Sequence, residues 1–581
     1  MSLLEALLQG GHLRPLDHAL AATLRRLDAD TPDLVQAGAA LASLAVAQGH
    51  AGFDPSRPGL LLDAALPWPP LPEWEAALAS SRWVSRAADD GTTAQAPLVF
   101  DHGLLYLRRY REYEQRLAMR LRSLATQAPA WSSDDGLRPL FDTLFPGAGG
   151  DDRQAQAALL ALQRALLLVT GGPGTGKTTT ITRLLLLLVA QARHAGAPPL
   201  RIAMAAPTGR AAERMAQSVR GAIERLQAAG VEPSLLEALP REASTLHRLL
   251  GTIPGSPRFR HDAANPLPLD VVVVDEASMV DLPLMCKLTE AVGDGSRLLL
   301  LGDPDQLPSV EAGDVLSGIV AAAERGSLAG HRVHLQRGYR QAEGFDLGPL
   351  TAAVRDGDAD TVLDLLRNRP GAGVHFHEAL EDPLVGPPRE RLLAHWRALA
   401  AASSPADALA LAMRLRLLVA LRTGPQGTQA LDSRIGDALA GAHRESYFQG
   451  RLLLVTENSY RHHLFNGDIG VCLRDDDGAM LAWFPGHGSD DARAFHPASL
   501  PAHEGAFAMT VHKAQGSEFD SVWLLLPRTV NRVLSRELVY TALTRARREL
   551  HVCAGADILR ESLGRRVQRV SGLAHRLRDA T

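Results

Sequence analysis

The glycine-rich segment from residue 171 to residue 178 carries the clearest chemistry in this chain. Its sequence, Gly-Gly-Pro-Gly-Thr-Gly-Lys-Thr, fits every fixed position of the phosphate-binding loop G-x-x-x-x-G-K-[ST]. Backbone N–H groups of such a loop close around phosphate oxygens, Lys177 would reach the β- and γ-phosphates, and the Thr178 hydroxyl would hold Mg²⁺. The segment therefore predicts a nucleoside triphosphate site formed by Gly172, Gly174, Thr175, Gly176, Lys177, Thr178 and Thr179.

Two later segments place polar side chains where they could act on a bound triphosphate. The apolar run 271–274 ends in Asp275 and Glu276. Asp275 would bind Mg²⁺ through water, and Glu276 would orient or deprotonate the attacking water. After the apolar run 298–301, the amide of Gln306 could contact the γ-phosphate or that water. An acidic strand end and a plain turn are the alternatives, and the order of the three motifs favours catalysis.

The elements that must position these groups alternate between strand-like and helical patterns. A helical pattern from Thr179 to Ala190 follows the glycine-rich loop, and breakers at 253–268 predict a small inserted hairpin. Alternation of this kind predicts a parallel sheet with helices on both faces. The predicted strands within residues 151–335 are 166–169, 202–206, 271–274 and 298–301.

The rest of the chain has other patterns. Residues 1–125 have mainly helical spacing, interrupted by a Pro-rich connector at 66–72, for which a partner-binding role is the less favoured alternative. Residues 126–150 have the composition of a linker. Short β-like runs and turns within 441–505 predict a small β-barrel insertion, and residues 518–555 return to α/β patterning.

Length, charge and cysteine content limit the class of protein. A chain of 581 residues allows about four domains. The net charge of −4 excludes a generally basic coat, so any nucleic-acid site must be a local groove. The three cysteines have no metal or redox spacing, and neither a signal peptide nor a bilayer-spanning apolar run is evident. We therefore expect a soluble cytoplasmic protein that does not associate with membranes.

Several further segments resemble, in order and wording, the motifs of superfamily 1 DNA helicases of the B subgroup. The resemblance covers about 150–560 and implies an α/β fold with two RecA-like P-loop NTPase motor domains. The second motor domain would comprise 336–440 and 506–581, interrupted by an SH3-like β-barrel at 441–505. The matching positions are Gln154, Ala206–Ala212, Thr245–Gly251, Gly338–Gln341, Thr510–Phe519 and Val539–Ala546.

This resemblance implies that ATP and Mg²⁺ bind between the two motor domains. Gln154 would read the adenine base, and Tyr339 either stacks on that base or belongs to the core. Gly516 and Glu518 would also lie at the nucleotide, with Glu518 holding the ribose. Each of these roles comes from the family rather than from the spacing of the residues.

The same resemblance makes Arg340 and Arg545 arginine fingers, which would reach across from the second domain to the γ-phosphate. A guanidinium there would stabilise the charge of the transferring phosphoryl group. The alternative for either arginine is a surface salt bridge.

The remaining motifs would face single-stranded DNA and contact its phosphates or bases without reading sequence. For His247 a structural role is the alternative, and Lys513 could either bind a phosphate or brace its loop. The basic C-terminal tail, which includes Arg576, is expected to be a solvated helix face rather than a DNA site. The predicted DNA contacts are Pro207, Thr208, Arg210, Thr245, His247, Thr510 and His512.

The whole chain also resembles the RecD family, the alpha subunits of the RecBCD enzyme (exodeoxyribonuclease V). Segments that carry this resemblance include 13–17, 259–261, 421–427 and 466–470. It implies a 5′-to-3′ motor on single-stranded DNA and duplex ends, acting in double-strand break repair and recombination. It also implies a heterotrimer with RecB-like and RecC-like subunits, with the N-terminal domain docked on RecC and the nuclease centre on RecB.

One position departs from this family, and two other functions remain open. Asp432 stands where we expect asparagine in the family. The first alternative function is a stand-alone 5′-to-3′ helicase of the same subgroup. The second is a DNA-binding regulatory subunit whose ATP site acts as a switch, which the presence of Glu276 and two candidate fingers argues against.

Overall fold

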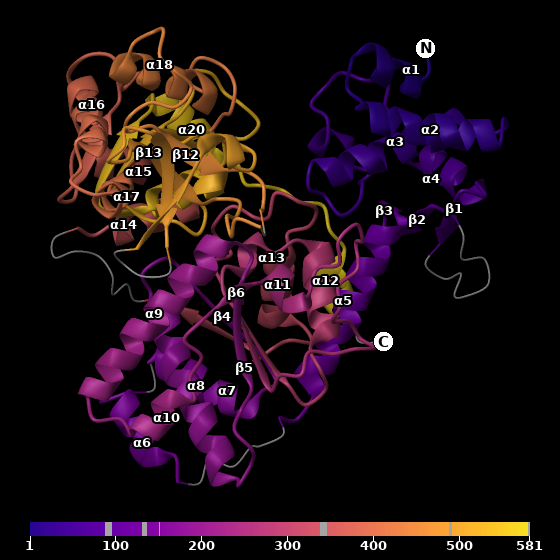
Figure 1. Ribbon diagram of the computed structural model, residues 1–581. Coiled ribbons are helices and arrows are strands. Elements are labelled where there is room, and N and C mark those ends of the chain that lie inside the picture. Colours follow the sequence, from indigo (N-terminus) through magenta and orange to yellow (C-terminus); the bar gives the residue numbers. More distant parts are fainter. Residues whose placement is uncertain are drawn as a thin grey trace.

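The chain folds into three lobes, which the computed structural model places side by side (Figure 1). The first is an N-terminal lobe, the second is built on a six-stranded sheet, and the third combines two five-stranded sheets. The second and third lobes correspond to the two expected motor domains and are called the first and second motor lobes. No helix among the described residues is long and apolar enough to cross a membrane. The structure describes residues 1–86, 96–129, 136–149, 152–336, 345–380, 382–459, 461–486 and 491–578.

The N-terminal lobe is helical in its first 80 residues and then contains a small sheet. Its helices pack around α3, most of which is buried. The three-stranded sheet, in the order β1-β2-β3, was not predicted. Its strands are short, and the turn at His102-Gly103, where both residues have positive φ, is the sequence signal that could have revealed the β2–β3 hairpin. The elements are α1 (Leu3–Gln9), α2 (Pro15–Leu27), α3 (Asp33–Ala47), α4 (Leu71–Ser80), β1 (Val84–Arg86), β2 (Leu98–Asp101) and β3 (Leu104–Leu107).

Helix α5 (Arg108–Thr126) connects this lobe to the next one. It packs along α12 (Leu282–Ala291), where Arg116 donates to Glu290 at 2.6 Å and Arg120 pairs with Asp294 at 2.7 Å. The predicted linker contains α6 (Arg138–Leu144), which packs against the helix of the glycine-rich loop. The end of the predicted N-terminal domain therefore falls on a helix that covers the first motor lobe.

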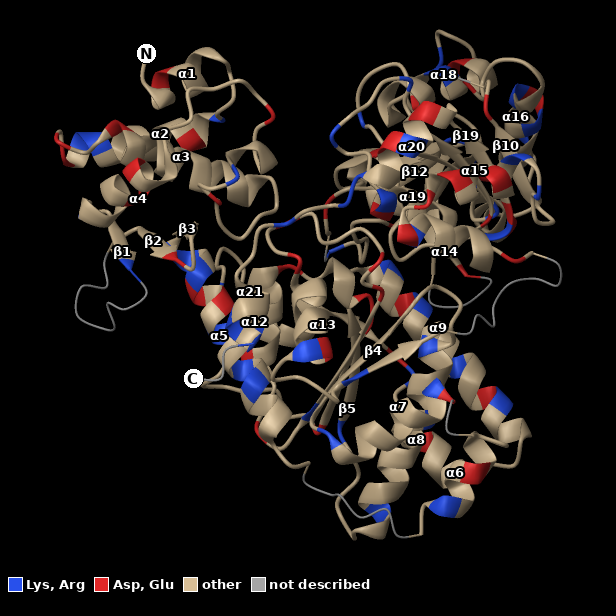
Figure 2. Ribbon diagram, turned by 180° about the vertical axis from the view of Figure 1, so that it is seen from behind, with Lys and Arg blue, Asp and Glu red and all other residues tan. Residues whose placement is uncertain are grey.

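The first motor lobe is a parallel sheet in the order β6-β5-β7-β8-β4-β9. Its strands carry apolar side chains on both faces of the sheet. A separate hydrophobic core lies on each face, one under α12 and α13 and the other under α7, α8 and α9 (Figure 2). The carboxyl ends of parallel strands meet at one edge, so the residues after β4, β7 and β8 come together there. The elements are α7 (Arg153–Gln163), β4 (Leu166–Gly171), α8 (Lys177–His194), β5 (Ile202–Ala206), α9 (Gly209–Ala228), α10 (Pro233–Glu237), β6 (Ser244–Thr245), α11 (Leu246–Leu250), β7 (Val271–Val274), β8 (Arg297–Gly302), α13 (Val315–Arg325) and β9 (Arg332–Leu335).

The predicted hairpin at 253–268 is a loop with a single antiparallel bridge at its start, between Thr252 and Phe259. Proline and glycine are frequent in it, and they interrupt strand pairing. The segment therefore forms turns instead of two paired strands.

The second motor lobe is also a parallel sheet, in the order β10-β19-β18-β11-β17. The chain leaves it after α18 and returns at β17, and the intervening residues form a separate antiparallel sheet. The elements of the lobe are α14 (Gly348–Asp356), α15 (Ala359–Arg367), β10 (Val374–His377), α16 (Pro387–Ala400), α17 (Pro405–Ala412), β11 (Leu415–Val419), α18 (Thr428–Ala440), β17 (Ala508–Thr510), β18 (Phe519–Leu525), α19 (Arg536–Leu543), β19 (Ala546–Cys553) and α20 (Ala556–Gly564).

The inserted sheet has the order β15-β14-β13-β12-β16 and is antiparallel throughout. Strands β15 and β16 are its two edges and do not pair with each other among the described residues. This order confirms an antiparallel β insertion within 441–505, and its folding as an SH3-like barrel stays a prediction. The strands are β12 (Leu452–Val455), β13 (Ile469–Arg474), β14 (Met480–Pro485), β15 (Ala492–Phe495) and β16 (His503–Gly505).

Asp432, on α18, contacts the backbone where the chain returns from this insertion to the second motor lobe. Its carboxylate accepts the N–H of Phe507 at 3.0 Å and fills the space beside Gly505, where a Cβ atom would lie 1.6 Å from Oδ2. Burial raises the pKa of the Asp432 carboxyl to about 6. The charged form is therefore unfavourable at this position, which explains why asparagine suits it.

We expect Asp432→Asn to stabilise the protein at neutral pH. Below pH 3.8, the ordinary pKa, both folded and unfolded states are protonated at this group, and it contributes nothing. Between pH 3.8 and about pH 6 the unfolded chain loses this proton while the folded protein still holds it, so the free energy of unfolding falls as the pH rises. Above about pH 6 both states are ionised at Asp432, and the free energy of unfolding keeps this lower value. Removing this penalty should add about 3 kcal/mol at neutral pH. Denaturant unfolding at pH 7.5 and 4 measures the gain, which should shrink at the lower pH.

The C-terminal segment leaves the second motor lobe and returns to the first, where α21 (Leu573–Arg578) packs on α13 and α5 (Figure 1). Arg576 is buried there and pairs with Asp101 at 2.5 Å and with Glu114 at 3.3 Å. The expectation of a solvated basic face was wrong for this arginine. Carboxylates from β2 and α5, distant in sequence, neutralise it.

Candidate functional site

The glycine-rich loop has the geometry that a phosphate site needs. Gly174 and Gly176 have φ of 78° and 81°, a conformation that glycine adopts without strain. The ammonium group of Lys177, at the start of α8, donates to the carbonyls of Gly171 at 2.6 Å and Gly172 at 3.0 Å. The lysine, the loop and the N-terminus of α8 therefore form one compact cationic site.

Gln154 lies next to this loop. It is near the start of α7, which Asp152 caps, and its amide donates to the carbonyl of Thr175 at 3.3 Å. The contact brings the side chain predicted to read adenine to the edge of the phosphate loop.

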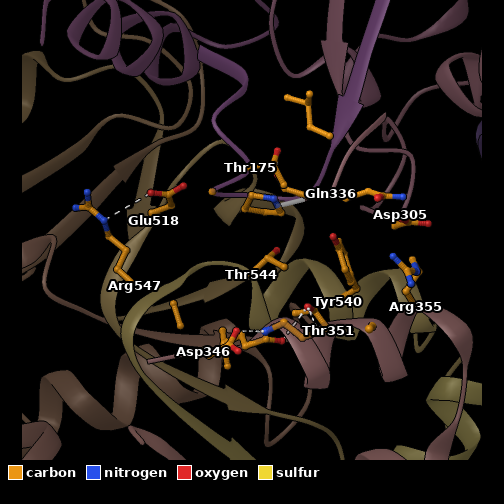
Figure 3. Close-up of a pocket in the computed structure, with 18 of the residues that line it drawn as sticks. Thr175, Asp305, Gln336, Asp346, Thr351, Arg355, Glu518, Tyr540, Thr544 and Arg547 are labelled. Atoms are coloured by element: carbon orange, nitrogen blue, oxygen red, sulfur yellow. Dashed lines mark hydrogen bonds and ion pairs between the residues drawn. The ribbon is translucent and has the colours of Figure 1, made fainter. Parts of the chain in front are cut away.

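A cavity of about 800 Å³ opens between the two motor lobes beside the loop (Figure 3). Its volume is in the range of small-molecule and cofactor sites. The first motor lobe contributes loop residues 172–175 together with Asp305 and His334. The second motor lobe contributes residues including Asp346, Thr351, Arg355, Glu518, Tyr540, Thr544 and Arg547.

Tyr540 reaches across this cavity and was missed as a site residue. It projects from α19 between the two lobes, and its hydroxyl donates to Asp303 at 3.1 Å (Figure 3). A Cβ atom on Gly172 would lie 2.9 Å from the same hydroxyl oxygen. Burial and the neighbouring Asp303 carboxylate raise the pKa of Tyr540, so the hydroxyl stays protonated and remains a donor. The tyrosine therefore connects the second lobe to both the phosphate loop and the Asp303 turn.

Asp275 and Glu276 follow β7 as expected. Burial, and next the adjacent Glu276, raise the pKa of Asp275, which Lys177 partly opposes. Glu276 has φ of 52° and ψ of 42°, a left-handed conformation that is rare for residues other than glycine. Local strain of this kind concentrates at functional sites.

Gln306 is buried beside the same edge of the sheet. Its amide nitrogen donates to Asp303 at 3.1 Å, whereas its amide oxygen is buried and has no hydrogen-bond partner among the described residues. A buried acceptor without a partner is costly. The unused oxygen is therefore available to a water molecule or a ligand group.

The backbone of Leu307, the next residue, is held by two side chains of the second motor lobe. The hydroxyl of Thr541 accepts its N–H at 2.9 Å, and the amide of Gln515 donates to its carbonyl at 2.7 Å. Both contacts are buried. Any movement between the lobes must therefore act on the loop that carries Gln306.

Arg545 lies at this interface on the second lobe and is 1% exposed. Its guanidinium donates to the carbonyls of Thr541 at 3.0 Å and Ser517 at 3.3 Å. Burial lowers its pKa, and Glu276 of the first lobe has the opposite effect. Its neighbour Thr544 lines the cavity. The other predicted finger, Arg340, and Tyr339 lie outside the described residues.

Glu518 lines the cavity, but its carboxylate is already paired. It accepts from Arg214 of α9 at 2.8 Å and lies 3.6 Å from Arg547. Arg214 also donates to the carbonyl of Gly516 at 3.1 Å. Gly516 itself packs against the first turn of α9 and does not line the cavity. Arg214, which no motif singled out, thus joins the two lobes here.

The predicted DNA contacts form one group on each motor lobe. Thr208 follows β5, and Thr245 is the last residue of the neighbouring strand β6. They cap α9 and α11, with Pro207 and His247 close to them in the sequence. On the second lobe, Thr510 ends β17 and accepts the N–H of Lys513 at 3.4 Å, close to His512. Hydroxyls at helix N-termini are suited to phosphate contacts. These residues are Pro207, Thr208, Thr245, His247, Thr510 and His512.

Arg210 is placed differently from the other predicted contacts. Its guanidinium donates to the sulfur of Met413 at 2.6 Å and lies 5.9 Å from the ring centroid of Phe519, both in the second lobe. Burial lowers its pKa to about 10. In this structure Arg210 fills the interface between the lobes.

The structure also distinguishes the two roles considered for Lys513. Its ammonium pairs with Glu504 of β16 at 2.5 Å, and Glu504 lies 3.7 Å from Arg422. This ion pair ties the motif to the inserted sheet, which favours the bracing role.

Three family models match successive parts of the chain. Residues 9–106 match the N-terminal domain of RecBCD enzyme subunit RecD. Residues 154–312 match an AAA domain, and residues 505–553 match a UvrD-like helicase C-terminal domain. The second and third matches contain the phosphate loop and Arg545, respectively.

Relatives match nearly the whole chain. RecBCD enzyme subunit RecD from Mycolicibacterium smegmatis is 41% identical over an alignment of 595 positions, which covers 100% of this chain and 100% of that subunit. The subunit of the same name from Haemophilus influenzae is 33% identical and covers 88% of this chain and 85% of its own. ATP-dependent RecD2 DNA helicase from Deinococcus radiodurans is 31% identical over 82% of this chain and 59% of its own.

Proposed function

The chain belongs to the RecD family of RecBCD enzyme subunits, and we propose that it is an ATP-dependent 5′-to-3′ DNA helicase, the motor subunit of a RecBCD-type complex. The observation that carries this proposal is the cavity shared by two α/β lobes, with the phosphate loop on one and Arg545 beside it on the other. A site divided in this way lets nucleotide binding draw the lobes together. It can therefore convert ATP hydrolysis into movement.

Four predicted catalytic groups, none of which lines the cavity itself, would act beside it, each in a separate role. Lys177 would bind the β- and γ-phosphates, and Glu276 would orient the attacking water. Gln306, whose buried amide oxygen has no partner in the described part of the chain, would sense the γ-phosphate or that water. Arg545 would stabilise charge on the transferring phosphoryl group once closure moves it away from its own carbonyls.

Magnesium fits the oxygen ligands present. Thr178 and Asp275 offer a hydroxyl and a carboxylate, which are hard donors of the type that Mg²⁺ prefers. Both are at the sheet edge, after β4 and β7. When bound there, the ion would neutralise charge on the triphosphate.

Hydrolysis would be coupled to DNA through the contacts between the lobes. Closure and opening would act on the Gln306 loop through Leu307, and on α9 through the pair of Arg214 and Glu518. Helix α9 begins at Thr208, one of the proposed phosphate contacts. The two groups of DNA contacts would then approach and separate once per ATP.

The family also supports the choice of partners and substrate. We assign single-stranded DNA and duplex ends as the track, and RecB-like and RecC-like subunits as partners in a heterotrimer. The N-terminal lobe, which matches the RecD N-terminal domain, would dock on the RecC-like subunit. We assign the nuclease centre to the RecB-like subunit, and the process to double-strand break repair and recombination.

The test is ATP-driven unwinding of duplexes that carry either a 5′ or a 3′ single-stranded tail, with Lys177→Gln as the inactive control. We expect unwinding of the 5′-tailed duplex only. Unwinding from the 3′ tail would overturn the polarity. If the isolated chain is inactive, the assay is repeated with RecB-like and RecC-like subunits added. If the complex that contains Lys177→Gln then unwinds the 5′-tailed duplex as well as the wild-type complex does, the motor role is wrong.

Tyr540→Phe should lower kcat/KM for ATP about tenfold while the fold is kept. The change removes only the hydroxyl that bonds to Asp303 across the cavity. Hydrogen bonds to charged groups contribute about 1.5–3 kcal/mol, and about 1.4 kcal/mol corresponds to tenfold. Steady-state ATPase kinetics with saturating DNA measure the change. If this variant has wild-type kinetics, the Tyr540 hydroxyl does not contribute to the alignment of the lobes.

A further inference from the structure

A second cluster of ligand-type side chains lies on one face of the second motor sheet, away from the nucleotide cavity. In the strand register, His375 of β10 pairs with His551 of β19, and His551 pairs with Trp523 of β18. Glu549 precedes His551 by two residues and so lies on the same face. None of these residues lines the nucleotide cavity.

The spacing of three donor atoms in this cluster suits a tetrahedral metal ion. Oε1 of Glu549 lies 3.4 Å from Nε2 of His375 and 3.3 Å from Nε2 of His551. All three donor atoms are within 4.8 Å of one another. With bonds of about 2.0–2.1 Å, donors around tetrahedral zinc are about 3.4 Å apart. Two of the three spacings already have this value.

His551 supplies an independent indication of a ligand. The residue is 2% exposed, and its Nε2 atom is buried without a hydrogen-bond partner among the described residues. Its Nδ1 atom lies 2.9 Å from Nε2 of His377. If Nδ1 carries the proton, Nε2 presents a lone pair toward Glu549. Metal-ligating histidines usually donate their other ring N–H to an acceptor that fixes the tautomer, and Nε2 of His377 would be that acceptor here.

The surroundings hold the His551 ring in place. Trp523 stacks on it at 3.8 Å between centroids with an interplanar angle of 6°.

His375 and Arg391 are the parts that must move. The His375 ring stacks on His551 at an interplanar angle of 17°, so it must rotate to direct its nitrogen at a shared ion; its side chain is 45% exposed and free to do so. Arg391, on α16, donates to both oxygens of Glu549, at 2.7 and 2.6 Å. Its guanidinium competes with a cation for this carboxylate, and its side chain is 52% exposed.

We propose that His375, Glu549 and His551 bind a divalent transition-metal ion, for which zinc is the best match. Two imidazoles and one carboxylate form a known ligand set for zinc, with a fourth position left to water. Bound there, the ion would join the edge strand β10 to β19 and displace Arg391 from Glu549. The proposal does not depend on the helicase function.

The test uses the full-length chain without a histidine tag, freed of metal by a chelator and titrated with Zn²⁺ and with Co²⁺. We expect one tightly bound equivalent and, with Co²⁺, the visible absorption of a four- or five-coordinate ion. His375→Ala and Glu549→Gln should weaken binding at least about tenfold. His443→Ala, which removes an exposed histidine outside the cluster, is the matched control and should bind like the wild type.

Arg391→Ala separates a metal site from a purely structural cluster. Removal of the competing guanidinium should tighten Zn²⁺ binding by up to about tenfold, whereas a structural role predicts no gain. Absence of a stoichiometric ion, equal binding by His375→Ala and His443→Ala, or weaker binding in Arg391→Ala would each overturn the proposal. Retained ATPase activity of each variant shows that it is folded.

Discussion

Lys177→Gln should lower the ATPase kcat by at least about 100-fold and leave the fold intact. The ammonium group is the one cation of the phosphate loop itself, and it lies 2.6 Å from the carbonyl of Gly171 at the mouth of the loop. Glutamine can still donate to those carbonyls, but it carries no charge for the phosphates. Loss of one pre-positioned group that stabilises charge in a transition state costs about 10²–10³ in kcat.

The chain offers a matched control for this variant. Lys287, one of only three lysines in the sequence, lies on α12 of the same lobe, and its ammonium donates to the carbonyl of Pro257 at 2.6 Å. Lys287→Gln makes the same chemical change outside the cavity and should leave kcat unchanged. Steady-state ATPase assays and thermal unfolding compare the two variants. Turnover at the wild-type rate in Lys177→Gln would remove the loop from catalysis.

Arg545→Ala should retain ATP binding and lose hydrolysis by about 10³-fold or more, the range found for arginine fingers. In this structure the guanidinium is buried and donates to two backbone carbonyls of its own lobe. To act as an arginine finger, it must leave these carbonyls when the lobes close. Lysine keeps the charge but lacks the planar fork of donors, so Arg545→Lys should recover only part of the activity.

Arg548→Ala is the control for this position. It removes an arginine three residues further along the chain, whose side chain is 73% exposed and lies 4.0 Å from Asp520. ATP binding is measured with a fluorescent analogue and hydrolysis by phosphate release, so the two steps are separated. Weak ATP binding in Arg545→Ala with a normal rate at saturation would point to a binding role instead.

The sequence was sufficient to predict those elements whose conformation depends on residues close together in the chain. A glycine-rich turn, a buried strand before it and a helix after it lie within about 30 residues, and their conformations follow from local preferences. The first parallel sheet and the positions of Asp275 and Gln306 could be predicted for this reason. Membership of the RecD family was predicted from the resemblance of the motifs, and the relatives confirm it. The β1–β3 sheet was missed because its strands are too short for periodicity to show.

The contacts between side chains of different lobes could not be predicted from the sequence. Tyr540 contacts Asp303, Arg214 contacts Glu518, and Arg210 packs on Met413, although each pair is more than 200 residues apart in the sequence. An arginine in a motif has the same local pattern whether it faces DNA, a phosphate or another lobe. The choice depends on burial and on which carboxylate is near, and these arise only when the distant segments are packed together.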